Sequence, residues 1–346
     1  KIPIGLAAIQ FGEKQEQFEA ALDAEVNFSY RKGLLRVDIL LGRVPDHIGF
    51  DKIVSMGANS FQVEFHALMN SLPFELPFIV GYGRQGWLYS GLVDCPHLLV
   101  AGQTGAGKSN FLHTLISCLM QVDCVIHIID LKRVEFSYLK KHLTVKHSLN
   151  GAIETLEFLT AEMQRRMAFL DRAGFVSAKE WRKTHPDRAN ELPYHVLVID
   201  EFSQLCPMLA KEKNDRMVRT YAHKMLVDLI CLARSLGIHV VIATQRPDQH
   251  ILPGQLKANI PATLCFRVRS TTNSQICLDR NGAEKLPSPK EIPGRAIWQH
   301  DEEREVQTMY MPINQAKTLM QSQRSKNVIE QACQMGRFRG GMVCSG

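Results

Sequence analysis

The feature that most constrains the fold of this chain is a cluster of glycines between two apolar segments, in LLVAGQTGAGKSNFL at residues 98–112. The first apolar segment is typical of a buried strand, and the second, which follows Lys108 and Ser109, is typical of a helix. Glycine adopts positive φ at no steric cost, and it lets the backbone approach another group closely because it lacks a Cβ atom. The stretch therefore predicts a strand, a tight loop with inward-pointing N–H groups, and a helix.

The loop GQTGAGKS, residues 102–109, fits the pattern G-x-x-x-x-G-K-[ST] of a phosphate-binding loop. The loop N–H groups and the positive end of the helix dipole favour phosphate there. We expect Lys108 to reach the β- and γ-phosphates of ATP and Ser109 to bind Mg²⁺ through its hydroxyl. A glycine-rich turn that only caps a helix is the alternative. The residues expected to contact the nucleotide are Gly102, Thr104, Gly105, Ala106, Gly107, Lys108, Ser109 and Asn110.

Strands that are apolar along their whole length alternate with long helical patterns over most of the chain. Continuous apolar strands are typical of a parallel sheet buried on both faces, and the alternation indicates helices on both sides. Leucine and methionine at intervals of three or four predict helices over 153–174 and 222–237, ended by Gly174 and Gly237. The sequence therefore predicts an α/β fold. The predicted strands are 97–102, 124–130, 195–200, 239–245 and 262–268.

A second acidic site is required for hydrolysis, and HVLVIDEF at residues 195–202 supplies it. Asp200, at the end of a buried strand beside the phosphate-binding loop, is expected to hold Mg²⁺ together with Ser109. Glu201 is placed to polarise the attacking water. Gln245, in the strand end VVIATQRP, can sense the γ-phosphate. The alternatives are an acidic pair and a solvated polar residue that merely end two strands.

These motifs occur in one order with HIIDLKRVEF, AEMQRRM, LARSLGIHVVIATQRPD, LKANIPATLCFRV and NGAEKLP. Together they resemble the motor domain of the FtsK/SpoIIIE family of ATPases over about residues 75–298. The resemblance implies a RecA-like P-loop NTPase that binds ATP and Mg²⁺. It also implies a homo-oligomer, a hexameric ring that pumps double-stranded DNA through its central pore.

The resemblance also assigns roles to single residues. Lys108, Asp200, Glu201 and Gln245 take the catalytic roles described above, and Arg234 in ARSLG is expected to reach into the ATP site of the neighbouring subunit. Arg165 and Arg166 are second candidates for that intersubunit role. A surface salt bridge is the alternative for each of these arginines.

Basic residues are expected to line the pore. Arg246 matches the first pore loop, where it would touch the DNA backbone without reading sequence. The second pore loop corresponds to residues 267–279, in which Arg267 and Arg269 are the nearest basic residues. Farther along this loop the sequence departs from the family pattern and has Thr271, Thr272 and Gln275 in place of basic residues.

Three parts of the chain are predicted. Residues 1–72 are expected to form a small α+β domain, the ring-forming tier, with a helix at 15–26 and strands at 33–42 and 60–68. Residues 73–312 form the RecA-like motor, and residues 313–346 form a short helix and a flexible basic tail. The tail from residue 321 holds half of the net charge of +6. A winged-helix domain is not expected after Pro312, which favours a conjugation-type or mobile-element motor.

The composition bounds the cellular setting. Nine cysteines without a CxxC pair indicate reduced thiols in a cytoplasmic protein. The histidines form no HxxxH pair, so the sequence gives no sign of a metal site made of histidines. No apolar run has the roughly 18 residues of a membrane span, and an anchor to the inner face of the cell membrane upstream of Lys1 stays open.

The predicted function is an ATP-hydrolysing ring motor that translocates double-stranded DNA without strong sequence specificity, in chromosome segregation or conjugative transfer. A secretion-type ATPase of the same family, which moves protein substrates, is the alternative. A nucleotide-binding assembly subunit with little turnover and a RecA-type recombinase are further alternatives. Intact Lys108, Asp200 and Glu201 argue against the assembly subunit.

Overall fold

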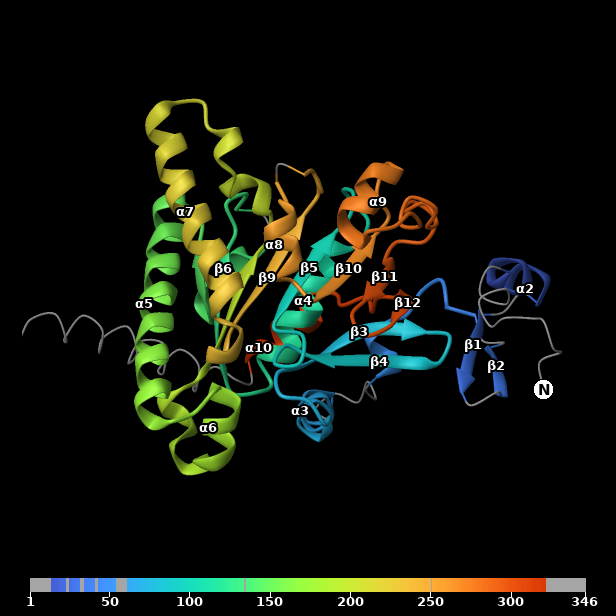
Figure 1. Cartoon of the computed structure of the whole chain (residues 1–346), viewed down its shortest axis with the longest axis horizontal. Helices are drawn as coiled ribbons and strands as arrows, with labels where there is room; N and C mark the ends of the chain where they lie inside the picture. The colour runs from blue at the N-terminus through green and yellow to red at the C-terminus, as the bar shows by residue number, and fades with distance from the viewer. Residues whose placement is uncertain are drawn as a thin grey trace, which may run out of the picture.

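The computed structural model describes residues 14–22, 25–31, 34–40, 43–53, 61–133, 135–249 and 251–321. Within these residues the body of the protein is a ten-stranded sheet with the order β4-β3-β12-β11-β10-β5-β9-β8-β6-β7 (Figure 1). Six strands form its parallel part: β5 (His97–Ala101), β6 (Cys124–Ile129), β7 (Thr144–Lys146), β8 (Tyr194–Ile199), β9 (Ile238–Thr244) and β10 (Ala262–Phe266). The antiparallel extension is made of β3 (Pro77–Gly83), β4 (Gly86–Gly91), β11 (Arg295–Gln299) and β12 (Glu303–Gln307).

The parallel strands are buried on both faces, which confirms the predicted α/β class. Alternate residues of β5 point to opposite sides: Leu98 and Val100 belong to one hydrophobic cluster, and Leu99 and Ala101 to the other. Because water reaches neither face, these strands have no polar alternation in their sequences. The five predicted strands are found within two residues of their expected bounds.

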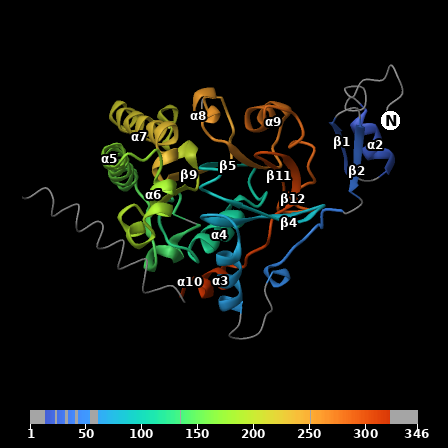
Figure 2. The same ribbon diagram turned by 60° about the horizontal axis from the view of Figure 1, so that its bottom comes forward.

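Helices cover the two faces of the sheet (Figure 2). The first cluster includes side chains from α3 (Phe61–Ser71), α4 (Lys108–Leu119) and α10 (Ile313–Gln321). The second includes side chains from α5 (Leu149–Ala173), α6 (Ala178–Thr184) and α7 (Lys213–Leu232), with α5 packed along α7. Two short helices, α8 (Gly254–Ala258) and α9 (Thr271–Leu278), flank β10 in the chain.

Helix α5 differs from its predicted bounds mainly at its start, and helix α7 differs at both ends. Helix α5 begins four residues early, where Ser148 accepts a hydrogen bond from the N–H of Gly151, and it ends at Gly174 with φ of 73°. Helix α7 begins nine residues earlier than predicted and ends at Leu232. A 3₁₀ turn, Arg234–Leu236, then leads to Gly237 with φ of 72°.

The N-terminal part differs from the prediction in two places. Helix α2 (Gln15–Leu22) and strand β2 (Leu34–Leu40) lie within the predicted helix and strand. Strand β1 (Glu25–Arg31), which pairs with β2 in a hairpin, was not predicted, and its first two residues fall in the predicted helix at 15–26. Residues 61–68 of the strand predicted at 60–68 belong to helix α3 and do not form a strand. Apolar residues at every second position misled the prediction; the residues that are buried, Phe65 and Met69, are four apart and lie on one helical face.

Segments before residue 72 contribute to the core of the sheet. Ile48, Phe50, Phe65 and Met69 belong to the same cluster as strand β3 and helix α4. The hairpin β1–β2 and helix α2 lie at one end of the molecule, beyond the antiparallel strands (Figures 1 and 2). The domain boundaries at residues 72 and 312 stay predictions, and the tail after residue 321 lies outside the described residues.

Two general features follow from the described residues. None of their helices has the length and apolarity needed to cross a membrane. Seven cysteines are described, all as free thiols, and all but Cys231 are fully buried.

The parallel strands carry four buried histidines, His97, His127, His195 and His239. Burial lowers the pKa of His97 to about 3 and those of His127 and His239 to about 4, and it holds the pKa of His195 well below 6.5. In the unfolded chain these pKa values return to about 6.5. Below that pH the unfolded chain therefore binds protons that the folded chain does not.

We predict that the free energy of unfolding falls by at least about 1 kcal/mol per pH unit between pH 6.5 and 5. Urea unfolding at a series of pH values measures this slope. Burial raises the pKa of Asp200 to about 7, which opposes the trend, but one carboxyl acts against four imidazoles. Replacing His127 by glutamine, which does not titrate, should flatten the slope. A stability that is constant or rises toward pH 5 would contradict the prediction.

Candidate nucleotide-binding and hydrolysis site

The phosphate-binding loop connects β5 to α4 and has the backbone that its glycines allow. Gly102, Gly105 and Gly107 have φ of 151°, 77° and 117°. A Cβ atom on Gly102 would lie 2.6 Å from Cβ of Phe266, and one on Gly107 would lie 3.0 Å from Cα of Gly294. A Cβ atom on Gly105 would meet nothing within 4 Å, so that side of the loop is open to a ligand.

Backbone hydrogen bonds fix the loop to the ends of neighbouring strands. The N–H of Gly102 donates to Thr244 O at the end of β9, and the N–H of Gln103 donates to Arg267 O after β10. Ala106 O accepts from the N–H of Gly294, just before β11. Three strands therefore hold the loop in place before any ligand binds.

Lys108 lies in the first turn of α4, and its side chain turns back into the loop. Its Nζ donates to the carbonyl oxygens of Gly102, at 2.5 Å, and Gln103, at 2.8 Å. Burial lowers the pKa of Lys108 to about 8, against the attraction of Glu201 and Asp200. An ammonium in this position suits the phosphates of a nucleotide, whose negative charge favours the protonated form.

Asp200 and Glu201 follow β8, and β9 lies between β8 and β5. The strand of Asp200 is therefore one strand away from the phosphate-binding loop and not directly beside it, which corrects the expectation. The two acids still meet the loop because parallel strands end at the same edge of the sheet. Burial is the main cause that raises the pKa of Asp200 to about 7, and Lys132 acts against it.

Gln245 links the acids to the loop. Its side-chain Oε1 accepts a hydrogen bond from the Thr104 hydroxyl at 2.9 Å, and its backbone N–H faces both carboxylate oxygens of Glu201 at 3.3 Å. The structure thus brings Gln245, Glu201 and the phosphate-binding loop together, as the motif order implied. Asn110 is directed elsewhere: its amide donates to Met309 O and accepts from the N–H of Met311, so it fixes α4 to the chain before α10.

Two functional candidates were missed, both after β6. Lys132 donates to Glu201 Oε2 at 3.0 Å. His113 and Ser109 lower the pKa of Glu135, whose Oε2 lies 3.8 Å from His113 Nε2, so this carboxylate stands near the residue expected to bind Mg²⁺. The available signal was the run DLKRVEF, because polar residues that follow a buried parallel strand gather at its carboxyl edge.

The chemistry of these side chains fits ATP with Mg²⁺. Mg²⁺ usually takes one or two protein oxygens and completes its shell with phosphates and water. Ser109, Asp200 and Glu135 offer such oxygens beside the loop. The described residues contain no group of three or more His, Cys, Asp or Glu side chains arranged to hold a metal ion without a substrate.

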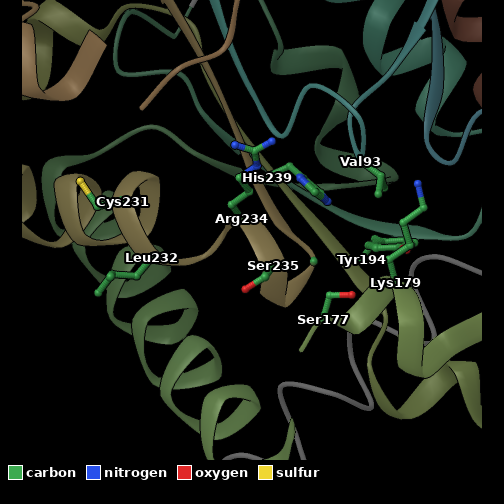
Figure 3. Close-up of a pocket in the computed structure, with 10 residues that line it drawn as sticks. Val93, Ser177, Lys179, Tyr194, Cys231, Leu232, Arg234, Ser235 and His239 are labelled. Atoms are coloured by element: carbon green, nitrogen blue, oxygen red, sulfur yellow. The ribbon is translucent and has the colours of Figure 1, made fainter. Parts of the chain in front are cut away.

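Arg234 lies at the opposite edge of the sheet. It stands four residues before the start of β9, whereas Thr244 and Gln245 at the far end of β9 belong to the nucleotide site. Its side chain is exposed and lines a pocket with Lys179, Tyr194 and other residues (Figure 3). Arg234 therefore points away from the nucleotide site of its own chain.

The prediction that Arg166 could reach a neighbouring subunit is wrong, because its side chain is completely buried within its own chain. It donates to Glu162 Oε1 at 2.6 Å and to the carbonyl oxygens of Pro193 and Leu236, at 2.6 and 2.8 Å. It thereby fixes the turn that presents Arg234. Arg165 is half exposed and forms a two-pronged ion pair with the same Glu162.

The expected pore residues have mixed outcomes. Arg246 and Arg269 are exposed. Arg267 donates to Leu286 O, so its guanidinium is engaged within the chain. Within the expected second pore loop, residues 267–279, residues 271–278 form helix α9 with Ser270 as its N-cap, and the role of this segment in a pore stays a prediction. The serine hydroxyl accepts the N–H of Asn273, a helix-start signal that the sequence contains.

Comparison with known proteins gives the family. The model of the FtsK/SpoIIIE family matches residues 62–249, more than half of the chain. The chain belongs to the FtsK/SpoIIIE family. Members of this family are P-loop ATPases, in agreement with the site described above.

Sequence relatives of the FtsK/SpoIIIE chain include the "DNA translocase FtsK" of Tropheryma whipplei, 36% identical over 235 residues. That match covers 62% of this chain and 30% of the relative, and the chain spans less than a third of the curated relatives it matches. Among solved structures, the conjugation coupling protein TcpA with ATPγS has a TM-score of 0.70 at 23% identity, over 91% of this chain and 86% of TcpA. The type VII secretion ATPase EccC of Thermomonospora curvata has a TM-score of 0.64 at 22% identity, over 81% and 34%.

Replacing Arg166 by methionine is expected to lower the free energy of unfolding by about 3 kcal/mol, because it leaves buried carbonyls and part of Glu162 without a donor. The loss stays at the low end of the range for buried pairs, since Arg165 still pairs with Glu162. Urea unfolding measures it. The matched control, Arg165→Met, removes a half-exposed partner and should cost about 0–1 kcal/mol. Equal losses in the two variants would refute the internal role of Arg166.

Proposed function

We propose that this chain hydrolyses ATP and uses the energy to move double-stranded DNA through a ring of its own copies, without strong sequence specificity. The main support for hydrolysis is the convergence of Lys108, Asp200, Glu201 and Gln245 at one edge of the sheet. The support for DNA is that the sequence relatives bear the name DNA translocase. The protein would act in the cytoplasm, with a membrane tether in a segment outside this sequence as an open possibility.

In the proposed mechanism the phosphate-binding loop holds the triphosphate through its N–H groups and Lys108. Ser109 and Asp200 would hold Mg²⁺, which when bound neutralises charge on the phosphate oxygens. Glu201 accepts hydrogen bonds from the attacking water and so orients it toward the γ-phosphorus. Gln245, hydrogen-bonded to Thr104 of the loop, transmits the presence of the γ-phosphate to the backbone beside Glu201.

The ring completes the site in this proposal. Arg234 lies before β9, at the end of the strand opposite its own nucleotide site. Its guanidinium would therefore reach the nucleotide of a neighbouring copy. An arginine supplied in trans stabilises charge on the transferred phosphoryl group. Isolated chains would then turn over slowly, and assembly on a substrate would raise the rate.

Duplex DNA should raise the steady-state ATPase rate of this chain, and the stimulation should fade as salt rises, because phosphate contacts release counterions. Glu201→Gln should lower the stimulated rate by about 10²-fold or more while nucleotide binding is kept. Arg246→Ala should weaken stimulation and its salt dependence. A coupled assay with duplex DNA, single-stranded DNA and an unfolded polypeptide measures these rates.

Three results would argue against this function. Stimulation by the polypeptide and not by DNA would support a secretion-type ATPase. Turnover equal in wild type and Glu201→Gln would contradict hydrolysis at this site. Binding of ATP without turnover under any condition would leave an assembly subunit.

A mixing experiment tests whether Arg234 acts in trans. Lys108→Ala chains lack a working nucleotide site but keep Arg234, whereas Arg234→Ala chains have the opposite defect. Each variant alone should show little DNA-stimulated activity. An equal mixture should recover a fraction of the wild-type rate, because an intact nucleotide site then meets an intact arginine in some interfaces. No recovery, in mixtures that form rings by electron microscopy, would place Arg234 outside the reaction.

A further inference from the structure

The carboxylate of Glu201 is fully occupied by donors from its own chain. Its Oε1 accepts from the hydroxyls of Ser203, at 2.8 Å, and Thr244, at 3.1 Å. Its Oε2 accepts from Lys132 Nζ at 3.0 Å, and the N–H of Gln245 faces both oxygens. A carboxylate offers about four lone-pair sites, so little capacity remains for a water molecule.

Lys132 differs from the other donors in its freedom to leave. Thr244 is the last residue of β9 and Gln245 follows it, and Ser203 comes shortly after β8, so the strands fix the two hydroxyls and the N–H group. Lys132 follows β6 on a turn, and its side chain is 31% exposed. A lysine ammonium is carried on a flexible four-carbon stem. When the side chain of Lys132 swings outward, water can take the place of Glu201 as the partner of the ammonium.

A physical connection runs from the exposed Arg246 to this carboxylate. The Thr244 hydroxyl lies 3.1 Å from Glu201 Oε1 and 3.3 Å from Arg246 O, and it accepts the N–H of Arg246 at 3.2 Å. Its single proton can be donated to Glu201 or to Arg246 O, but not to both. A shift of the backbone at Arg246 therefore changes how Glu201 is held.

We propose that Lys132 is a positioning residue that holds Glu201 in a resting state by occupying Oε2, and that engagement of the chain with DNA releases it. This inference rests on the proposed role of Glu201 in hydrolysis and adds a restraint on that role. With Lys132 in place, Oε2 is not available to water; when Lys132 withdraws, the same oxygen can orient the attacking water. The restraint limits ATP consumption by chains that are not engaged.

The test uses the whole chain with saturating Mg-ATP, with and without duplex DNA. Lys132→Met keeps the apolar stem and removes the ammonium. We expect its rate without DNA to rise about threefold to fivefold, the upper part of the scale of one partly exposed ion pair. Its rate with DNA should stay within about twofold of wild type, so that the stimulation ratio falls. Lys132→Arg should restore the low resting rate because it restores the donor. Lys140→Met, which removes an exposed lysine on the following turn, is the matched control and should resemble wild type.

The rates separate the possible outcomes. Parallel loss of both rates in Lys132→Met would overturn the proposal and make Lys132 an aid to catalysis. The same result for Lys132→Arg as for Lys132→Met would overturn it as well. Equal turnover in wild type and Glu201→Gln would instead be a failure of the proposed hydrolysis at this site.

A second measurement does not depend on turnover. Acylation of lysines by N-hydroxysuccinimidyl acetate, followed by mass spectrometry, reports how free each ammonium is. In the chain alone, Lys132 should react more slowly than Lys140. The reaction rate of Lys132 itself should rise when Mg-ATPγS and duplex DNA are added. Reactivity of Lys132 that equals that of Lys140 throughout, or that does not rise with both ligands, would overturn the proposal.

Discussion

The closeness of the phosphate-binding loop to the strand ends around it determines the rest of the site. Gly102 lies so near Phe266 that a single added carbon would clash at 2.6 Å, and Gly107 approaches Gly294 in the same way. Because interiors are close-packed, such contacts leave one position for the loop. Lys108 then starts α4 at a fixed place, at the edge of the sheet where β8 and β9 also end.

Charge balance at this edge is the second constraint. Asp130, Asp200, Glu135 and Glu201 gather there, and Asp130 is tied down by the N–H groups of Arg133 and Phe136. Burial opposes ionisation of Asp200, and the other carboxylates reinforce that opposition, whereas Lys132 acts against it. The site is therefore short of positive charge, which suits a place that receives a divalent cation with its nucleotide.

The sequence predicted the parallel strands and the nucleotide loop well, because both leave local signals: continuous apolar runs and a fixed glycine pattern. It did not predict the antiparallel extension, since β12 is partly exposed and its sequence EREVQ has little apolar content. Helix α3 was mistaken for a strand because its apolar residues also fit a period of two. Lys132 and Arg166 were missed or misassigned for another reason. Lys132 pairs with Glu201, which is 69 residues away in the chain. Arg166 donates to backbone carbonyls that are 27 to 71 residues away.

In the proposed ring, strand β9 would connect two ATP sites directly. Its seven residues span roughly 20 Å at about 3.3 Å per residue, and it is buried throughout. One end carries Thr244 and Gln245, which contact Glu201, and the other follows the turn of Arg234, which Arg166 fixes from α5. A strand in the centre of a parallel sheet moves as a unit with its neighbours. A change at Glu201 in one copy would therefore shift the arginine that the same copy presents to the next, without any hinge between them.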